Sequence, residues 1–292
     1  MSKNKISKIL TTVTIYSLLV MTGCGQSSTG TPEPTTLPQE TEAPAPTSAA
    51  VSESTPVPTT APENTPAPTE TSDPVTTPIS GEEWKSNLGT IDLSNLRVSG
   101  TGATVDGTII RITAGGDFFV TGTLENGKIV ISTTERVKLR LSNASISCNN
   151  DSAIFVEQSD KTFLTMEKGT TNTIFSKGTE EAAIYAKDDL EIKGNGTLTV
   201  TSQSGHGIKA SDDLNIENGT LIITAARDGI HTNETCDISG GTLTITAAKD
   251  GIESEENLLF RGGSITITAG GQAYTAAGEV TVDESNATIN VK

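Results

Sequence analysis

Residues 206–224 read HGIKASDDLNIENGTLIIT, and residues 228–246 read DGIHTNETCDISGGTLTIT. Both stretches pass from a Gly-Ile pair through a polar run and a short apolar segment to a Gly-Thr turn, which opens a second alternating segment. Equivalent isoleucines occur at positions 184, 208, 230 and 252, so their spacing is nearly constant. A fixed period of about 22 residues, made of strand-like rather than helix-like segments, predicts a β-solenoid.

Each repeat contains three short segments in which apolar residues alternate with polar ones, which is the pattern of a strand with one buried face. With Ile208 as the reference, the inward positions continue at Leu214 and Ile216, and then at Leu221 and Ile223. Three strands and about 22 residues per coil predict an all-β fold, a right-handed single-stranded parallel β-helix, because parallel crossovers are almost always right-handed. Equivalent positions of successive coils then lie about 4.8 Å apart along the axis.

This stacking gathers acidic side chains at the edges of the first strand of each coil. Three positions of the repeat are involved. Four residues after the isoleucine, successive coils carry Asp188, Asp212, Glu234 and Glu256. The next position carries Asp189, Asp213, Thr235 and Asn257, and the position two residues before the isoleucine carries His206, Asp228 and Asp250. Two carboxylates about 4.8 Å apart repel by roughly 0.9 kcal/mol in water and by roughly 3.5 kcal/mol at an effective dielectric constant of 20. Hard oxygen ligands in acidic clusters suit Ca²⁺, which we expect here. The alternative is a solvated acidic edge without an ion, because these positions lie near turns.

The beginning of the chain is of a different kind. Residues 1–24 combine three lysines with a short apolar segment and end in the sequence MTGC, which indicates a bacterial lipoprotein signal peptide with lipidation at Cys24. The apolar segment is too short and too rich in threonine for a stable membrane span. We therefore expect an extracellular protein at the cell surface, lipid-anchored to the cytoplasmic membrane and in contact with it only through the N-terminal lipid. Plain secretion after a nearby cleavage is the alternative.

Proline content separates two further regions. Residues 25–80 contain all 12 prolines of the protein, with threonine, serine, alanine and glutamate, and are predicted to form a disordered linker. At about 3.1 Å per residue, such a linker could reach on the order of 150 Å. Residues 81–292 contain no proline, which fits a chain that is strand nearly throughout. These residues are the predicted β-helix domain.

The net charge argues against one class of binding partner, and the cysteine positions argue against a disulfide and a structural zinc site. The formal net charge of −16 argues against nucleic acid as a partner and would also repel an acidic polysaccharide unless Ca²⁺ bridges the two. Cys236 occupies an inward position, and Cys148 lies about four coils away, which is too far for a disulfide. The sequence has no pair of cysteines and histidines at the spacing of a zinc site, which argues against structural zinc.

One outward strand face could bind sugars. Tyr185, Lys209 and His231 occupy equivalent outward positions, and Lys187 lies two residues beyond Tyr185. Tyrosine can stack on a pyranose ring, and the basic side chains can bind hydroxyl or carboxylate groups, although an ordinary solvated sheet face has the same composition. No nucleophile-elbow motif is present, and no catalytic residue is singled out by its spacing.

The repeat region resembles a known family. The run AAIYAKDDLEIKGNGTLTV at residues 182–200, the run HGIKASDDLNIENGTLIIT and the two later DGI motifs are similar to the bacterial carbohydrate-binding β-helix lipoproteins, which are relatives of the family 9 pectate lyases. The resemblance covers about Thr108 to Gly271. It implies several bound Ca²⁺ ions and binding to plant cell-wall polysaccharides, both pectin-like polygalacturonate and cellulose-like glucans.

The same resemblance assigns calcium ligands by motif. The DDL aspartates and the DGI aspartates are the candidates, namely Asp188, Asp189, Asp212, Asp213, Asp228 and Asp250. The next two coils depart from the pattern, with Asn233-Glu234-Thr235 and Glu255-Glu256-Asn257 in place of an aspartate pair, which leaves the number of ions open. The catalytic base of the related lyases has no matching motif here.

Three functional hypotheses follow. The leading one is a calcium-dependent polysaccharide-binding protein at the cell surface, without catalysis. The second is a calcium-dependent pectate lyase of the same fold, with Lys187, Lys209, Arg227 or Lys249 as the base. The third is a structural adhesin in which calcium only stabilises the contacts between coils.

Overall fold

The structure is a computed structural model that describes residues 83–178 and 181–292. The predicted signal peptide with Cys24 and the predicted linker lie outside the described residues. Within the described part, the secondary structure is almost entirely β-strand, with one short 3₁₀-helix, η1 (Glu83–Ser86). No helix in that part of the chain has the length and apolar character of a membrane span.

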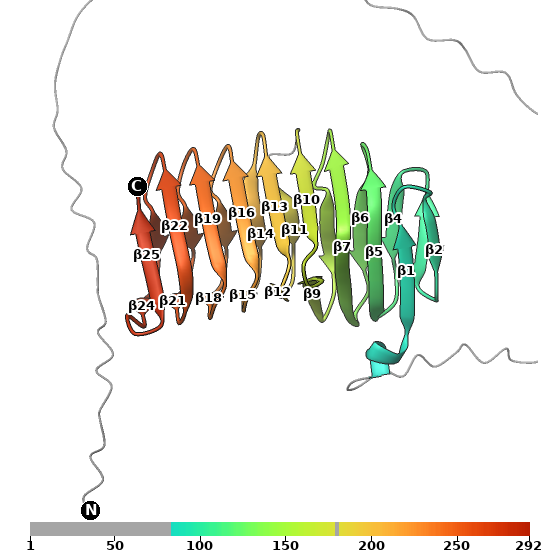
Figure 1. Ribbon diagram of the computed structural model, residues 1–292, viewed down its shortest axis with the longest axis horizontal. Helices are drawn as coiled ribbons and strands as arrows, with labels where there is room; N and C mark the ends of the chain where they lie inside the picture. The colour runs from blue at the N-terminus through green and yellow to red at the C-terminus, as the bar shows by residue number, and fades with distance from the viewer. Residues whose placement is uncertain (1–82, 179–180) are drawn as a thin grey trace, which may run out of the picture. The chain divides into compact units, whose positions relative to one another are not determined.

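The strands form three sheets along the length of the domain, which are parallel except at the N-terminal end (Figure 1). Sheet 1 contains β3 (Ala103–Asp106), β4 (Ile109–Ile112), β6 (Lys128–Ser132), β8 (Ile154–Gln158), β11 (Ala182–Ala186), β14 (His206–Ala210), β17 (Ile230–Thr232), β20 (Ile252–Ser254) and β23 (Tyr274–Ala276). Sheet 2 contains β9 (Lys161–Met166), β12 (Leu190–Gly194), β15 (Leu214–Ile216), β18 (Cys236–Ile238), β21 (Leu258–Phe260) and β24 (Val280–Val282). Sheet 3 contains β10 (Thr171–Ser176), β13 (Thr197–Ser202), β16 (Thr220–Ala225), β19 (Thr242–Ala247), β22 (Gly263–Ala269) and β25 (Ala287–Val291).

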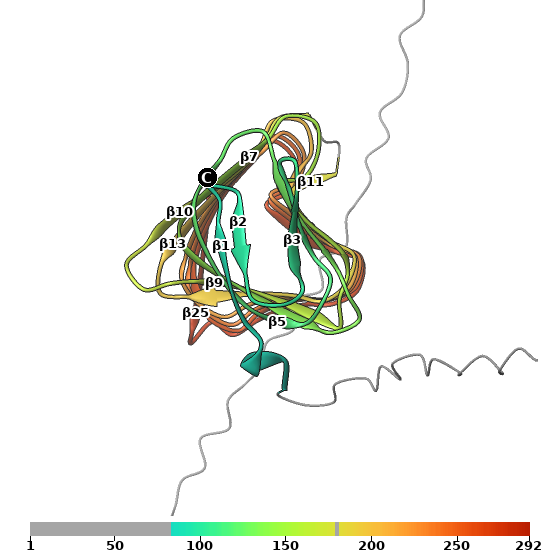
Figure 2. The same ribbon diagram turned by 90° about the vertical axis from the view of Figure 1, so that its right-hand side faces the viewer.

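Sheets 2 and 3 are continuous at the strand β7 (Arg136–Cys148), which pairs with β9 through its first half and with β10 through its second half. Seen along the axis, the three sheets form the three sides of a solenoid, and each regular turn of the chain contributes one strand to each sheet (Figure 2). The domain has about 8 turns of about 23 residues each. The predicted parallel β-helix with three strands per coil is therefore confirmed.

The register between coils follows the sequence repeat. Ile184 lies opposite Ile208, Ile208 opposite Ile230, and Ile230 opposite Ile252, and all four side chains are fully buried. Sheets 2 and 3 supply the other inward columns, which are Leu190, Leu214, Cys236 and Leu258, and Leu198, Leu221, Leu243 and Ile265. One continuous core of stacked aliphatic side chains results, and its burial drives the packing of the coils.

The glycine of each Gly-Ile pair lies at a point of close backbone approach. A Cβ atom on Gly229 would lie 2.3 Å from Ile245 Cγ2 and 2.6 Å from the carbonyl oxygen of Gly251. A Cβ atom on Gly207 would lie similarly close to Cγ2 of Ile223 and to the carbonyl oxygen of Gly229. The glycine therefore lets the corner between sheets 3 and 1 close tightly. It also holds the preceding residue, His206, Asp228 or Asp250, at that corner.

The N-terminal end departs from the repeat. There, β1 (Leu88–Asp92) pairs in antiparallel fashion with β2 (Arg97–Ser99) and in parallel with β5 (Gly116–Leu124), and β3 pairs in antiparallel fashion with β4. The Trp84 ring, 5% exposed, stacks on Phe163 of β9 with centroids 5.5 Å apart and planes 5° apart. These contacts cover the first coils, and the sequence repeat did not predict them.

Candidate functional site

The outward positions of sheet 1 form a column of large and polar side chains. The register places Tyr185 opposite Lys209, Lys209 opposite His231, and His231 opposite Glu253. The predicted order of these outward positions is therefore correct. The column continues towards the N-terminal end with Phe155 of β8, opposite Tyr185, and then Val130 of β6. Phe155 was missed because its coil is longer than the regular repeat.

The aromatic rings of this column are already in contact with neighbouring side chains. The Phe155 and Tyr185 rings stack with centroids 5.4 Å apart and an interplanar angle of 29°. Lys209 Nζ lies 5.2 Å from the centre of the Tyr185 ring and 2.7 Å from Glu181 Oε2. Lys187 Nζ lies 5.3 Å from the centre of the Phe155 ring. A sugar that stacks on Tyr185 must therefore displace Lys209, and a carboxylate that binds Lys209 must take the place of Glu181.

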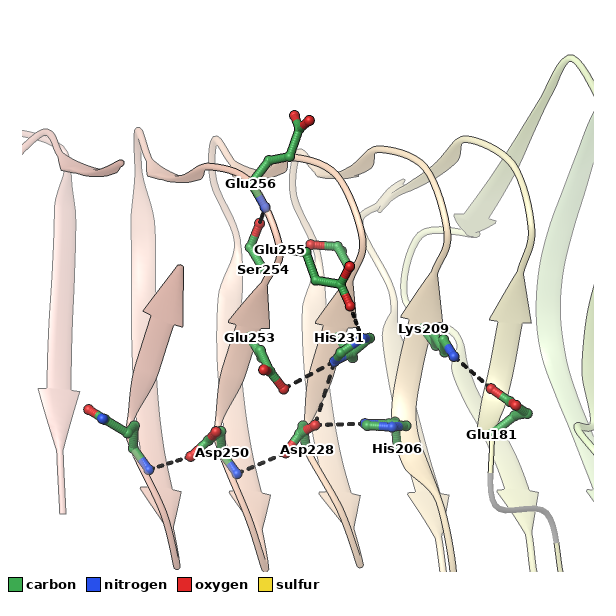
Figure 3. A network of polar contacts seen from close by, with 12 residues as sticks. Glu181, His206, Lys209, Asp228, His231, Asp250, Glu253, Ser254, Glu255 and Glu256 are labelled. Carbon is green, nitrogen blue, oxygen red and sulfur yellow. Dashed lines mark hydrogen bonds and ion pairs between the residues drawn. The ribbon is translucent and has the colours of Figure 1, made fainter. Parts of the chain in front are cut away.

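A histidine–aspartate cluster lies at the corner between sheets 3 and 1 and comprises His206, Asp228, His231, Asp250 and Glu253 (Figure 3). Asp228 Oδ2 is 2.9 Å from His206 Nδ1 and 3.6 Å from His231 Nδ1. The contact with His206 is an ion pair, and the buried His206 Nδ1 has no hydrogen-bond partner among the described residues. The imidazole rings are 4.8 Å apart between centroids. His231 Nδ1 also lies 3.2 Å from Glu253 Oε2.

Backbone groups and a second carboxylate hold this cluster in place. The N–H of Asp250 donates to Asp228 Oδ1 at 3.0 Å, and the N–H of Gln272 donates to Asp250 Oδ1. His231 Nε2 lies 3.6 Å from Glu255 Oε1. Each of the two aspartates thus uses one oxygen to join its coil to the next, and Asp228 keeps the other for the two histidines.

The protonation of the cluster follows from these contacts. Burial raises the pKa of Asp228, but the interactions with His206, His231 and the Asp250 backbone outweigh it and hold that pKa well below its ordinary value. The bond to Asp228 raises the pKa of His231 against the opposing effect of burial, and the charge of Glu253 raises it further. Asp228 is therefore ionised throughout the neutral range.

An acidic corner lies at the other edge of sheet 1, where the chain turns towards sheet 2. It comprises Asp188, Asp189, Asp212, Asp213, Glu234 and Glu256. Asp188 Oδ2 accepts a hydrogen bond from the N–H of Ser159 at 2.7 Å, and Asp213 Oδ1 accepts one from the N–H of Thr235 at 3.1 Å. These two carboxylates therefore also join neighbouring coils.

The carboxylates of the acidic corner repel one another. Burial raises the pKa of Asp189, and the charges of Asp212 and Asp213 add to this effect. Burial and neighbouring aspartates likewise raise the pKa of Asp212. The charge of Asp212 is the largest cause of the raised pKa of Glu234. The corner thus carries negative charge that its surroundings do not fully compensate.

The predicted metal ligands fall into two places. Among the described residues, two groups bring three ligand atoms within 4.8 Å of one another: His206 with Asp228 and His231, and Asp228 with Asp250 and Glu253. The four aspartates of the acidic corner belong to neither group. His206 and Glu253 were not predicted as ligands, although both occupy column positions that the repeat identifies.

Comparison with known proteins agrees with this architecture. The family described as "Carbohydrate-binding domain-containing protein" matches residues 106–292. A protein of the same description from Acetivibrio thermocellus is 28% identical over 128 residues, which cover 40% of this chain and 45% of the relative. The chain thus matches less than half of that relative's length.

A solved structure is also similar. It is described as the polysaccharide lyase-like protein from C. thermocellum, in a gadolinium derivative. The two structures superpose with a TM-score of 0.62 at 25% sequence identity, covering 70% of this chain and 98% of the other. The family match extends over more than half of the sequence, from the end of β3 to the last residue, and the chain belongs to the family of carbohydrate-binding domain-containing proteins.

Proposed function

We propose that this protein binds an acidic plant cell-wall polysaccharide, pectin-like polygalacturonate, along the outer face of sheet 1, and that Ca²⁺ bridges the polysaccharide to the acidic corner. The observation that carries the proposal is the uncompensated acidic corner beside the outward column of Tyr185 and Lys209, in a member of a carbohydrate-binding family. Cellulose-like glucans are the second class of ligand, held by hydroxyl contacts without the ion.

The repeat of the β-helix suits a linear polymer. Equivalent positions of successive coils lie about 4.8 Å apart, and both the outward column and the acidic corner extend over successive coils. A chain of identical sugars laid along the axis would meet equivalent positions at each coil, with carboxylates repeated at the acidic corner and a different side chain at each step of the outward column. Lys187 and Lys209 would contact carboxylates or hydroxyls directly, and the acidic corner would act through the cation.

Calcium fits the chemistry of the acidic corner. Carboxylate oxygens are the hard ligands that Ca²⁺ prefers, and Ca²⁺ takes about 6–8 oxygen ligands in flexible geometry. The four aspartates of the corner do not converge on one point, so an ion held there needs oxygens from water or from the glycan. The similar lyase-like structure was obtained as a gadolinium derivative, and gadolinium is likewise a hard cation. We therefore expect weak binding of calcium alone and tighter binding with polygalacturonate.

Titration calorimetry with a defined oligogalacturonate tests this proposal. The full chain should bind the oligomer with Ca²⁺ present and should bind it at least tenfold more weakly in excess chelator. The variant Asp212→Asn/Glu234→Gln removes two charges whose side chains are not needed for hydrogen bonds between the described coils. It should lose most of the calcium-dependent affinity.

A matched control removes the same two charges elsewhere. Asp106→Asn/Glu125→Gln changes exposed carboxylates at the N-terminal end of the helix and should bind as the unchanged protein does. Equal affinity in both double variants would contradict the role of the acidic corner. Growth of absorbance from unsaturated uronate products during the titration would instead show a lyase, and calcium-dependent stability without any glycan binding would show the adhesin.

The cell-surface location is also part of the proposal. A lipid on Cys24 would hold the protein at the cytoplasmic membrane, and the proline-rich linker would extend the β-helix away from it. In bacterial cells, Cys24→Ala should move the protein from the membrane fraction to the soluble fraction. An unchanged membrane fraction would contradict lipidation at this residue.

A further inference from the structure

We propose that His206, Asp228 and His231 bind a first-row transition metal ion, with Zn²⁺ as its representative, at the corner between sheets 3 and 1. This site is separate from the acidic corner and does not depend on the polysaccharide proposal. It also changes the expected role of Asp228, which the family resemblance assigned to calcium.

The spacing of the three side chains suits such an ion. In a tetrahedral zinc site with bonds of about 2.0–2.1 Å, neighbouring ligand atoms are about 3.3 Å apart. Asp228 Oδ2 lies 2.9 Å from His206 Nδ1 and 3.6 Å from His231 Nδ1, which bracket that separation. All three ligand atoms lie within 4.8 Å of one another, so a small adjustment of the side chains brings them around one ion.

His206 provides the second, independent observation. Its side chain is 4% exposed, and its Nδ1 has no aligned hydrogen-bond partner although it is directed at the Asp228 carboxylate. Buried polar atoms in native proteins almost always have a partner, and an unmatched one needs an explanation. A metal ion between Nδ1 and the carboxylate would satisfy both groups.

Carboxylates and a backbone group also surround the proposed ligands. A histidine that binds a metal through one ring nitrogen commonly donates the other N–H to a carboxylate, and His231 Nε2 faces Glu255 at 3.6 Å. The ligating carboxylate is itself held, since Asp228 Oδ1 accepts from the N–H of Asp250. Both histidines would bind through Nδ1.

The ligand types decide the class of ion. Imidazole nitrogens suit Zn²⁺, Ni²⁺ and Cu²⁺, whereas Ca²⁺ takes oxygen ligands. A fourth ligand can come from Glu253, whose Oε2 lies 3.2 Å from His231 Nδ1. It can also come from Asp250, which has a ligand atom within 4.8 Å of those of Asp228 and Glu253. His206 lies in β14, and Asp228 and His231 lie just before and within β17, so the ion would cross-link these two successive coils (Figure 3). A fourth ligand from Glu253 or Asp250 would add the coil of β20.

Titration calorimetry of the full chain with Zn²⁺ alone, after removal of metals by chelator, tests the proposal. We expect one Zn²⁺ per chain, and at least tenfold weaker binding in His206→Gln and in His231→Gln. Zn²⁺ should raise the thermal midpoint of the unchanged protein and not that of these variants, because the ion binds only the folded state. Co²⁺ in place of Zn²⁺ should give the visible absorption of a nitrogen-ligated ion.

Two further variants complete the test. Glu255→Gln keeps every ligand and should weaken Zn²⁺ binding less than the histidine variants do. Asp212→Asn, in the acidic corner, should bind Zn²⁺ normally, and His206→Gln should keep its calcium-dependent binding of oligogalacturonate. These two results separate a failure of the metal site from a failure of the polysaccharide proposal.

Three outcomes would overturn the inference. They are the absence of Zn²⁺ binding in the unchanged protein, equal affinity in the unchanged protein and both histidine variants, and displacement of Zn²⁺ by Ca²⁺ at comparable concentrations. Circular dichroism of each variant shows whether the β-helix is intact, and Glu255→Gln serves as the readout if a histidine variant does not fold.

Discussion

Gly229 shows at the scale of one residue why the Gly-Ile pair repeats. A Cβ atom at this position would lie 2.3 Å from Ile245 Cγ2 and 2.6 Å from the carbonyl oxygen of Gly251. Gly229→Ala should therefore destabilise the protein by about 1–3 kcal/mol through overpacking, measured by urea unfolding. Gly169→Asn is the control, because Gly169 has open space around it and asparagine tolerates its positive φ of 74°. Equal stability of the two variants would contradict the packing role of the repeated glycine.

Glu191 carries a prediction about pH. Its buried carboxylate lies 3.0 Å from Lys161 Nζ and bonds to Lys193. Burial raises the pKa of Glu191, but the hydrogen bonds from the two lysines outweigh it and hold the pKa below its ordinary value. A lowered folded-state pKa means that the stabilisation is complete above the unfolded pKa of about 4.3 and is lost as the pH falls through the folded pKa.

Glu191→Gln should consequently cost roughly 1–3 kcal/mol of unfolding free energy at pH 7 and less at pH 3, measured by urea unfolding at both values. Glu217→Gln is the matched control, because Glu217 is more exposed and lies 3.7 Å from the same Lys193. We expect a change within about 0.5 kcal/mol for this variant, as for other exposed ion pairs. A pH-independent cost in Glu191→Gln would contradict the ion-pair account.

The candidate site was only partly predictable from single residues. The sequence repeat predicts which residues share a column, and Tyr185, Lys209, His231 and Glu253 do share one. It does not predict contacts between two columns, because these depend on side-chain rotamers. The contact of Asp228 with His206 and His231 is of that kind.

At the level of elements, the helix η1 packs through Trp84 on Phe163, at the outer side of β9. Trp84→Ala should remove the stacking on Phe163 and speed hydrogen exchange in β1 and β9, while β19 remains protected. The effect should stay local because the coils of a solenoid contact only their neighbours. Leu88→Ala, at a side chain that is 63% exposed, is the control and should change neither region. A uniform loss of protection along the whole helix would contradict this account.

The strand positions could be predicted where the sequence repeat is regular and not where it is irregular. The coils from β11 to β22 follow a nearly constant spacing, and their strands lie where the alternation of apolar residues indicates. The antiparallel pairs β1–β2 and β3–β4 have no counterpart in the repeat, so their pairing could not be read from it. The first coils of a solenoid must close one end of the core, which requires a different pattern.

At the scale of the whole molecule, the stacking of coils turns a short motif into a surface. The outward column of sheet 1 shares His231 and Glu253 with the histidine–aspartate cluster, and the acidic corner lies at the other edge of the sheet. An extended ligand along the axis would meet the outward column and the acidic corner together, so a repeated scaffold suits a linear polymer. The choice of glycan and ion depends on chemistry that the repeat alone does not encode.

Affinity electrophoresis of the full chain in native gels that contain polygalacturonate, run with Ca²⁺ or with chelator, shows whether Ca²⁺ bridges the protein to the polysaccharide. Polygalacturonate should retard the protein with Ca²⁺, and the chelator should abolish the retardation. Asp212→Asn/Glu234→Gln should migrate freely in both gels. Equal migration of the unchanged protein with and without polygalacturonate, in the presence of Ca²⁺, would contradict polysaccharide binding through a calcium bridge.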